Sequence, residues 1–259
     1  MAFLADDLRM AIDRVAFARS VGIEPDDWQG DLLRSASERI LLNCCRQSGK
    51  STAAALIALH RALYHPGSLV LILAPAERQA KETFGKIAQA YLKQGHSVAP
   101  ESYRKLGMWL ANGSRVEALP GSERTIRGFS GVDLLVLDEA ARVDDGLYFA
   151  VRPMLAVSGG ALMMLSTPAG RRGVFFEEWT EGAGWERYEV PAEECPRISG
   201  AFLEQERCSL PRRVFDQEYR CVFVETEDAV FSFEDVAGAL DPGVTPLFGA
   251  PAEPEGKAG

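Results

Sequence analysis

The sequence has little histidine and no paired cysteine motif. Its 259 residues include 3 histidines and 5 cysteines, at positions 44, 45, 195, 208 and 221. The cysteines form no Cys-x-x-Cys pair, and no histidine stands at the spacing of a zinc site. These absences argue against a zinc-binding or disulfide-stabilised domain, and they favour a reducing compartment such as the cytoplasm.

Long hydrophobic runs and a basic N-terminus are also missing. No apolar run approaches the roughly 20 residues that a helix needs to span a bilayer. The first seven residues, Met-Ala-Phe-Leu-Ala-Asp-Asp, place acids where a secretion signal carries bases. We therefore expect neither secretion nor a membrane partner.

The chain lacks an excess of positive charge, since its net charge is −9. A negative chain argues mildly against nucleic acid as a partner, because phosphate binding relies on basic surface. Net charge does not say where the arginines cluster, however. Several are concentrated in the middle of the chain, at Arg115, Arg124, Arg127, Arg171 and Arg172.

What the sequence does contain is a candidate phosphate-binding loop at residues 40–59. A short apolar run is followed by a polar loop ending Gly49-Lys50-Ser51 and then by an Ala/Leu-rich, helix-like segment. Amides of the loop and helix start would attract an anion, Lys50 would meet the β- and γ-phosphates, and Ser51 would hold Mg²⁺. Cys44 stands where the usual pattern has its first glycine, so a helix that begins Gly-Lys-Ser by chance is the alternative.

The remaining pattern alternates between strands and helices. Continuous apolar runs at 69–74, 132–137 and 161–165 predict strands buried on both faces, and 185–190 alternates like an edge strand. Residues 5–20, 51–64, 76–93 and 199–224 have a helical period. Residues 106–119 alternate around Asn112-Gly113, which predicts a β-hairpin. The fold class predicted is α/β, with a mostly parallel central sheet, flanking helices and an inserted hairpin.

Polar residues follow the predicted strands where ligands of open parallel sheets bind. Asp138 and Glu139 end one strand, where Asp138 would hold the metal with Ser51 and Glu139 would deprotonate a water. Ser166 and Thr167 end the next strand, where their hydroxyls would touch the γ-phosphate or would merely stabilise a turn. Upstream of the loop, the Gln29 amide would read an adenine edge, unless it is an ordinary surface glutamine.

Together, residues 22 to 233 resemble the ATPase domain of the phage terminase large subunit, the motor that packages double-stranded DNA into a procapsid. The matching segments are Asp27-Trp28-Gln29, Cys45–Ser51, Leu134–Ala140 and Ser166-Thr167-Pro168. Terminases often lack the usual first glycine and carry an arginine in the phosphate loop, so Cys44 and Arg46 support the resemblance. It implies the three-layer P-loop NTPase fold and Mg²⁺-dependent ATP hydrolysis.

The resemblance also implies roles for particular residues. The ATP-binding set would be Gln29, Arg46, Gln47, Ser48, Gly49, Lys50, Ser51 and Thr52. The catalytic set would be Glu139, Lys50, Arg46 and Arg127, with Ser51 and Asp138 as metal ligands and Ser166 and Thr167 coupling hydrolysis to movement. Either Arg127, as a finger given to a neighbouring subunit, or Arg46 in cis would neutralise transition-state charge. A solvated surface arginine is the alternative for Arg127.

The partners implied are double-stranded DNA, a portal protein, a terminase small subunit and further copies in a ring, in the host cytoplasm. We expect an ATPase domain at 1–225, a linker-like segment at 226–240 and a disordered tail at 241–259. Terminase large subunits continue into a nuclease domain, and we expect no DNA cleavage by this chain. Two alternatives are another oligomeric or helicase-like P-loop ATPase, and an ATP-binding regulatory or remnant module with little turnover.

Overall fold

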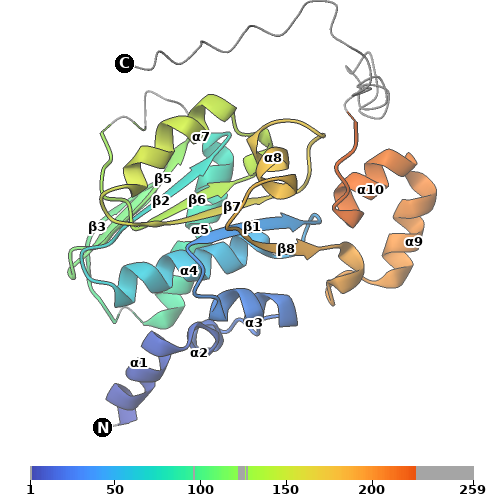
Figure 1. Cartoon of the computed structure of the whole chain (residues 1–259). Coiled ribbons are helices and arrows are strands. Elements are labelled where there is room, and N and C mark those ends of the chain that lie inside the picture. Colours follow the sequence, from blue (N-terminus) through green and yellow to red (C-terminus); the bar gives the residue numbers. More distant parts are fainter. Residues whose placement is uncertain (1, 96, 122–125, 127, 226–259) are drawn as a thin grey trace, which may run out of the picture. The chain divides into compact units, whose positions relative to one another are not determined.

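The computed structural model describes residues 2–95, 97–121, 126 and 128–225 (Figure 1). Residues Met1–Val224 form one compact unit and Glu225–Gly259 a second, in which Glu225 alone is described. The expected linker at 226–240, the expected disordered tail and Arg127 all lie outside the described residues.

Helices and strands alternate along most of this unit. The α-helices are α1 (Ala2–Ile12), α2 (Arg14–Ser20), α3 (Asp27–Arg34), α4 (Lys50–Tyr64), α5 (Glu77–Gln94), α7 (Asp145–Val151), α8 (Val174–Thr180), α9 (Gly200–Ser209) and α10 (Arg212–Arg220). The strands are β1 (Arg39–Cys44), β2 (Leu69–Ala74), β3 (Pro100–Arg104), β4 (Gly107–Leu110), β5 (Arg115–Pro120), β6 (Leu134–Asp138), β7 (Ala161–Ser166) and β8 (Glu186–Val190). Short 3₁₀ turns are η1 (Ala140–Arg142), η2 (Arg152–Leu155) and η3 (Ala192–Glu194).

The strands form one sheet in the order β3-β4-β5-β2-β6-β7-β1-β8. Strands β5, β2, β6, β7, β1 and β8 pair in parallel, and β3 and β4 are added antiparallel at one edge. Strand β7 separates β1 from β6, so the ends of these three strands lie side by side. The predicted mostly parallel sheet is confirmed.

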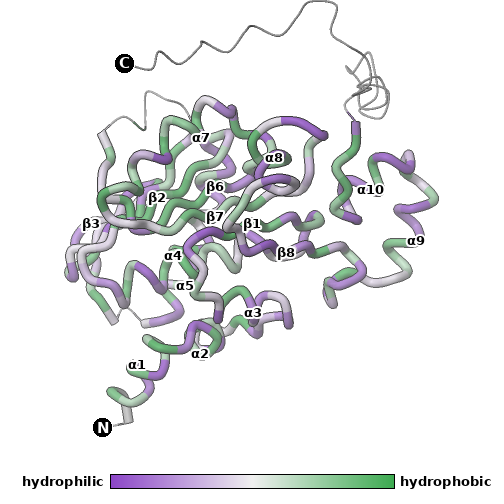
Figure 2. The backbone as a smooth tube through the Cα atoms, viewed as in Figure 1, coloured by the Kyte–Doolittle hydropathy of each residue, from purple (hydrophilic) through white to green (hydrophobic). Residues whose placement is uncertain are grey.

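Both faces of the sheet are covered, because alternate side chains of each strand enter different cores. On β2, Val70 and Ile72 pack with α4 and α5, whereas Leu71 and Leu73 pack with α7 and α8. Helices therefore flank the sheet on both sides (Figure 1). The tube of Figure 2 is hydrophobic along β2 and β7, as burial on both faces requires.

The structure divides two of the predicted helical stretches and extends the predicted hairpin. The stretch 199–224 is interrupted at Leu210 and Pro211, which separate α9 from α10. The single helix expected over 5–20 is wrong: the chain breaks at Asp13, whose backbone is extended and whose carboxylate accepts a hydrogen bond from Val15 N at 2.8 Å, capping α2. The hairpin at Asn112-Gly113 is confirmed as β4 and β5. It extends the main sheet, because β5 pairs in parallel with β2, and Met108 and Val116 are fully buried.

Helix α10 and the residue after it are hydrogen-bonded to the end of β1 and to the loop that follows it. The backbone N–H of Arg46 donates to the Glu218 carbonyl at 3.0 Å, and Asn43 Nδ2 donates to the Cys221 carbonyl at 2.8 Å. This attachment places α10 directly against the loop after β1. Within the described part of the chain, no helix is both long and apolar enough to cross a membrane.

Candidate nucleotide-binding site

The loop between β1 and α4 bends at two residues with left-handed backbone. Gln47 has φ 61° and Gly49 has φ 93°, and α4 begins at the next residue, Lys50. Cys44, by contrast, is the buried last residue of a strand, where no positive φ is needed. Burial raises the pKa of its thiol to about 12, so Cys44 acts as a small apolar residue. The missing first glycine is therefore no defect of this loop.

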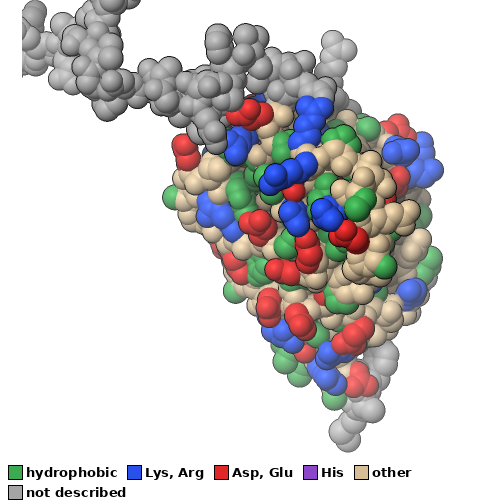
Figure 3. All heavy atoms as spheres, turned by 90° about the vertical axis from the view of Figure 1, so that its right-hand side faces the viewer, with side chains coloured by type: hydrophobic (Ala, Val, Ile, Leu, Met, Phe, Trp, Pro, Cys, Tyr) green, Lys and Arg blue, Asp and Glu red, His purple; other side chains and the backbone are tan. Residues whose placement is uncertain are grey.

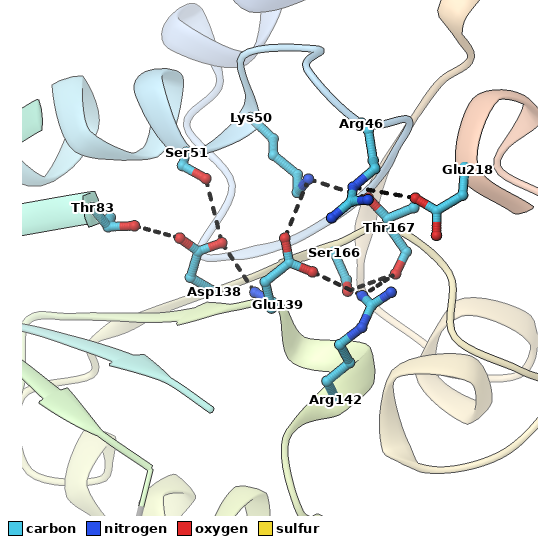
Figure 4. Close-up of polar contacts among 10 residues, drawn as sticks. All are labelled: Arg46, Lys50, Ser51, Thr83, Asp138, Glu139, Arg142, Ser166, Thr167 and Glu218. Carbon is cyan, nitrogen blue, oxygen red and sulfur yellow. Dashed lines mark hydrogen bonds and ion pairs between the residues drawn. The ribbon is translucent and has the colours of Figure 1, made fainter. Parts of the chain in front are cut away.

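Side chains from the ends of two neighbouring strands, β6 and β7, converge on Lys50 and Ser51, which follow β1 (Figure 4). Lys50 Nζ lies 3.5 Å from Glu139 Oε1 and donates to Thr167 Oγ1 at 3.2 Å. Ser51 Oγ donates to Asp138 Oδ1 at 3.4 Å. The strand order explains this convergence. Strands β1, β7 and β6 are adjacent and parallel, so their carboxyl ends lie side by side.

The two acids at the end of β6 have different environments. Asp138 is only 3% exposed, and its pKa is raised by burial, against an opposing hydrogen bond from Thr83. Glu139 has left-handed backbone, with φ 53°, and its side chain is 22% exposed and paired with Lys50 and Arg142. The turn thus directs one carboxylate inward and the other toward the open crevice.

The donor set at Ser51 and Asp138 fits Mg²⁺, which prefers hard oxygen ligands. Their oxygens are 3.4 Å apart and face each other. The described residues contain no cluster of three or more His, Cys, Asp or Glu side chains that would hold a metal alone. A metal here would therefore take its remaining ligands from phosphate and water, which is how Mg²⁺ is bound at nucleotide sites.

The other predicted loop residues lie around this centre. Arg46 is exposed, and its Nε lies 3.3 Å from Glu218 Oε2, so its charge is directed toward α10. Gln47 is exposed, Ser48 is fully buried and Thr52 is half-buried. Their predicted contacts with a nucleotide stay predictions.

Gln29 and Ser166 make contacts that the sequence did not indicate. Gln29 is 5% exposed, and its Oε1 accepts a hydrogen bond from Asp26 N at 3.1 Å, closing a capping box at the start of α3. It also packs against Gly49. Ser166 is fully buried, and its hydroxyl donates to the Thr167 carbonyl at 2.7 Å. Adenine recognition and coupling stay predictions for these side chains.

Sequence reasoning missed three residues that support the site. Thr83 donates to Asp138, Arg142 binds Glu139, and Arg197 donates to the Ser48 carbonyl at 2.5 Å while pairing with Asp26 at 2.7 Å. Arg142 stands three residues after Glu139, a spacing that was visible in the sequence. Thr83 and Arg197 carried no local signal, because they are brought to the site by packing.

The sheet order, the loop and the convergent polar side chains define a class of P-loop NTPase folds. In this class another strand, here β7, separates the strand before the phosphate loop, β1, from the strand that ends in the two acids, β6. The chain belongs to the terminase large subunit family: residues 41–237 match the family model described as "Terminase large subunit, T4likevirus-type, N-terminal". The resemblance seen in the sequence is thereby confirmed.

Curated and solved relatives agree with this assignment. The large terminase subunit of Thermus phage G20c is 26% identical over 257 residues, a match that covers 85% of this chain and 53% of that protein. The chain thus spans about half the length of the curated relatives it matches.

Among solved structures, the ATPase domain of the large terminase of Thermus phage P74-26 matches with a TM-score of 0.71 at 25% identity, covering 80% of this chain and 97% of that domain. The large terminase of the thermophilic bacteriophage D6E, solved in complex with ADP, matches with a TM-score of 0.64 at 11% identity, covering 77% of this chain and 54% of that one. The second likeness supports the fold alone.

Proposed function

We propose that this chain is the ATPase module of a packaging motor, hydrolysing ATP with Mg²⁺ to move double-stranded viral DNA into a procapsid. The observation that carries the proposal is the meeting of Lys50, Ser51, Asp138 and Glu139 at one sheet edge, within 3.5 Å of one another in pairs. Family membership and the likeness to the ATPase domain of the phage P74-26 large terminase support the choice of ATP.

Each side chain has a defined task in this proposal. The Lys50 ammonium and the loop amides bind the β- and γ-phosphate oxygens. Ser51 and Asp138 would hold Mg²⁺, which when bound neutralises phosphate charge. Glu139 accepts a proton from the water whose oxygen attacks the γ-phosphorus, while the bond from that phosphorus to the bridging oxygen breaks and ADP leaves. Ser166 and Thr167 respond to loss of the γ-phosphate.

The transition-state charge needs an arginine, and two candidates are proposed. Arg46 would have to leave Glu218, since its guanidinium now points to α10 (Figure 4). Arg127 would act on the ATP of a neighbouring copy, which requires a head-to-tail ring. The second candidate predicts that ATP hydrolysis depends on protein concentration. Arg127→Ala should then abolish hydrolysis only above the concentration at which the ring assembles.

DNA, the portal protein and the small subunit are proposed partners, and the host cytoplasm is the proposed compartment. On the face that carries α9 and α10, basic and acidic side chains are interspersed (Figure 3). Several pair within these helices, among them Arg207 with Glu204 and Arg212 with Asp216. Electrostatic DNA binding would thus need basic residues supplied by another face or by ring assembly.

Steady-state ATPase measurements with and without double-stranded DNA, at rising protein concentration, test the proposal. Turnover that requires Mg²⁺ and rises with concentration and DNA is expected of a motor that assembles. Turnover independent of concentration would indicate another P-loop ATPase. Nucleotide binding without turnover under every condition would indicate a binding module.

Glu139→Gln is the decisive variant, because glutamine keeps the shape of the side chain but cannot accept the proton. Turnover should fall by about 10²- to 10⁴-fold, the usual contribution of a general base, while ATP affinity should be retained. Unchanged turnover would remove Glu139 from the mechanism. A matched control is Glu204→Gln on α9, an exposed carboxylate paired with Arg207.

A further inference from the structure

Helix α5, which is neither part of the phosphate loop nor one of the strand ends, contributes the hydroxyl of Thr83 to the site. Thr83 is 2% exposed and lies 55 positions before Asp138 in the chain. Its Oγ1 donates to Asp138 Oδ2 at 2.5 Å, between two groups that are both buried. A hydrogen bond from a neutral hydroxyl to a carboxylate is among the stronger kinds in proteins.

The two oxygens of Asp138 are thereby given different surroundings. Oδ2 accepts from Thr83, whereas Oδ1 accepts from Ser51 Oγ at 3.4 Å and from Glu139 N at 3.0 Å. In Figure 4, Thr83 approaches the carboxylate from the side opposite Glu139. With one oxygen held on each side, the carboxylate plane has little freedom to rotate, and Oδ1 stays directed at Ser51.

Packing alone does not require a hydroxyl at this position. Thr83 lies in a helix between core residues such as Ala80, Phe84 and Ile87, where an isosteric valine would fill the same volume. A helical threonine commonly donates to a carbonyl one turn back, but this one donates across to β6. A buried hydroxyl is costly without a partner, and Asp138 is the partner that the fold supplies.

We propose that Thr83 is a positioning residue for metal and nucleotide binding, holding Asp138 so that Oδ1 and the Ser51 hydroxyl together receive the divalent cation. The inference rests on the proposed function, since it assumes that Asp138 takes part in binding a metal–nucleotide complex. The donor of this hydrogen bond belongs to α5, a helix that contains neither the phosphate-loop motif nor the motifs at the strand ends.

The test is the affinity of Mn²⁺, as a spectroscopic substitute for Mg²⁺, in the presence of saturating ADP, measured by electron paramagnetic resonance. Thr83→Val should weaken Mn²⁺ binding by about 10- to 100-fold, the usual loss when a partner of a metal ligand is removed. Thr83→Ser keeps the hydroxyl and should remain within about threefold of the wild-type affinity. ADP affinity in EDTA should be the same in all three proteins.

Thr180→Val is the matched control, because Thr180 is exposed and donates only to carbonyls of its own helix, α8. It should bind Mn²⁺ like the wild type. If Thr83→Val does not fold, as judged by circular dichroism, Thr83→Cys offers a side chain of similar size with a weak donor and the same expected loss.

Wild-type Mn²⁺ binding that Thr83→Val leaves unchanged would overturn this inference and leave the proposed function standing. Loss of affinity in Thr83→Ser equal to that in Thr83→Val would also overturn it, because the hydroxyl would then not be the cause. If the wild-type protein showed no metal-dependent ADP binding at all, the proposed function would fail, and the inference with it.

Discussion

The guanidinium of Arg142 joins the two strand ends of the site: its Nη1 lies 2.9 Å from Glu139 Oε2 and 3.4 Å from the Thr167 carbonyl oxygen. Glu139 follows β6 and Thr167 follows β7, so one side chain connects the proposed base with the proposed coupling segment. Arg142 belongs to the 3₁₀ turn η1, which begins directly after Glu139. The bond therefore orients Glu139 at little entropic cost.

Replacing Arg142 by alanine should lower kcat by about 10- to 150-fold, since a hydrogen bond to a charged group contributes about 1.5–3 kcal/mol and about 1.4 kcal/mol is a factor of ten in rate. KM for ATP should change less than about threefold, because Arg142 contacts Glu139 and not the phosphate loop. Arg142→Lys keeps the charge without the planar fork, so its kcat should lie between those of the wild type and of Arg142→Ala. Steady-state kinetics in which KM alone changes would contradict this role.

Arg197 connects the start of α3 to the phosphate loop, pairing with Asp26 and donating to the Ser48 carbonyl. Arg197→Ala leaves both partners without this donor, so the free energy of unfolding should fall by about 1–3 kcal/mol. Nucleotide affinity should fall as well. Denaturant unfolding and ADP titration measure the two effects.

The control for this change is Arg207→Ala, which removes an exposed pair with Glu204 within α9. Its effect on the free energy of unfolding should be much smaller than that of Arg197→Ala, because water and salt screen a fully exposed ion pair. Equal losses in the two variants would show that Arg197 supports the loop no more than any surface arginine does.

Gly49 should not tolerate a side chain. Its φ is 93°, and a Cβ would lie 2.6 Å from Gln29 Nε2 and 3.1 Å from Arg197 Nη2. Gly49→Ala should cost about 1–2 kcal/mol of backbone strain and abolish detectable ADP binding. Gly85→Ala is the counterpart, because Gly85 lies within α5 and no atom beyond its chain neighbours and the helix backbone lies within 4 Å of its Cβ position.

In Gly85→Ala the helix gains alanine without a clash, so unfolding should become harder by about 0.5–1 kcal/mol. Thermal unfolding of both variants checks the contrast in sign. A Gly49→Ala protein that binds ADP normally would mean that the loop backbone adapts.

His60 makes stability depend on pH. Burial lowers the pKa of this imidazole to about 4, although the Met10 carbonyl that contacts it opposes the shift. The unfolded chain, with a histidine pKa of about 6.5, binds the proton more readily than the folded protein. The contribution of His60 to the free energy of unfolding is therefore fully present above pH 6.5. It decreases as the pH falls toward 4, by up to about 3 kcal/mol.

Carboxylates titrate in part of the same range, so the comparison must be with a variant. His60→Gln should have a smaller decrease in unfolding free energy between pH 6.5 and 4.5 than the wild type, whatever its stability at pH 7. Parallel pH profiles for the two proteins would show that His60 is not the cause.

Much of the fold was readable in the sequence because its signals are local. The buried runs at β2, β6 and β7 are continuous and apolar, and the Asn112-Gly113 corner predicts its hairpin by turn chemistry. The break at Asp13 was missed because the apolar pattern of residues 5–20 continues through it, and only a side-chain cap divides α1 from α2. Pairing of the hairpin with β2 is a long-range choice that local pattern does not contain.

The sequence by itself determined the parts of the site that adjoin recognisable strand ends: the loop residues Gly49 to Ser51 and the acids Asp138 and Glu139. The tertiary structure decided that Cys44 needs no glycine conformation, that Arg46 pairs with Glu218, and that Thr83 and Arg197 support the site. The physical reason is sequence separation. Contacts across 55 to 172 positions depend on sheet order and helix packing, which no local period encodes.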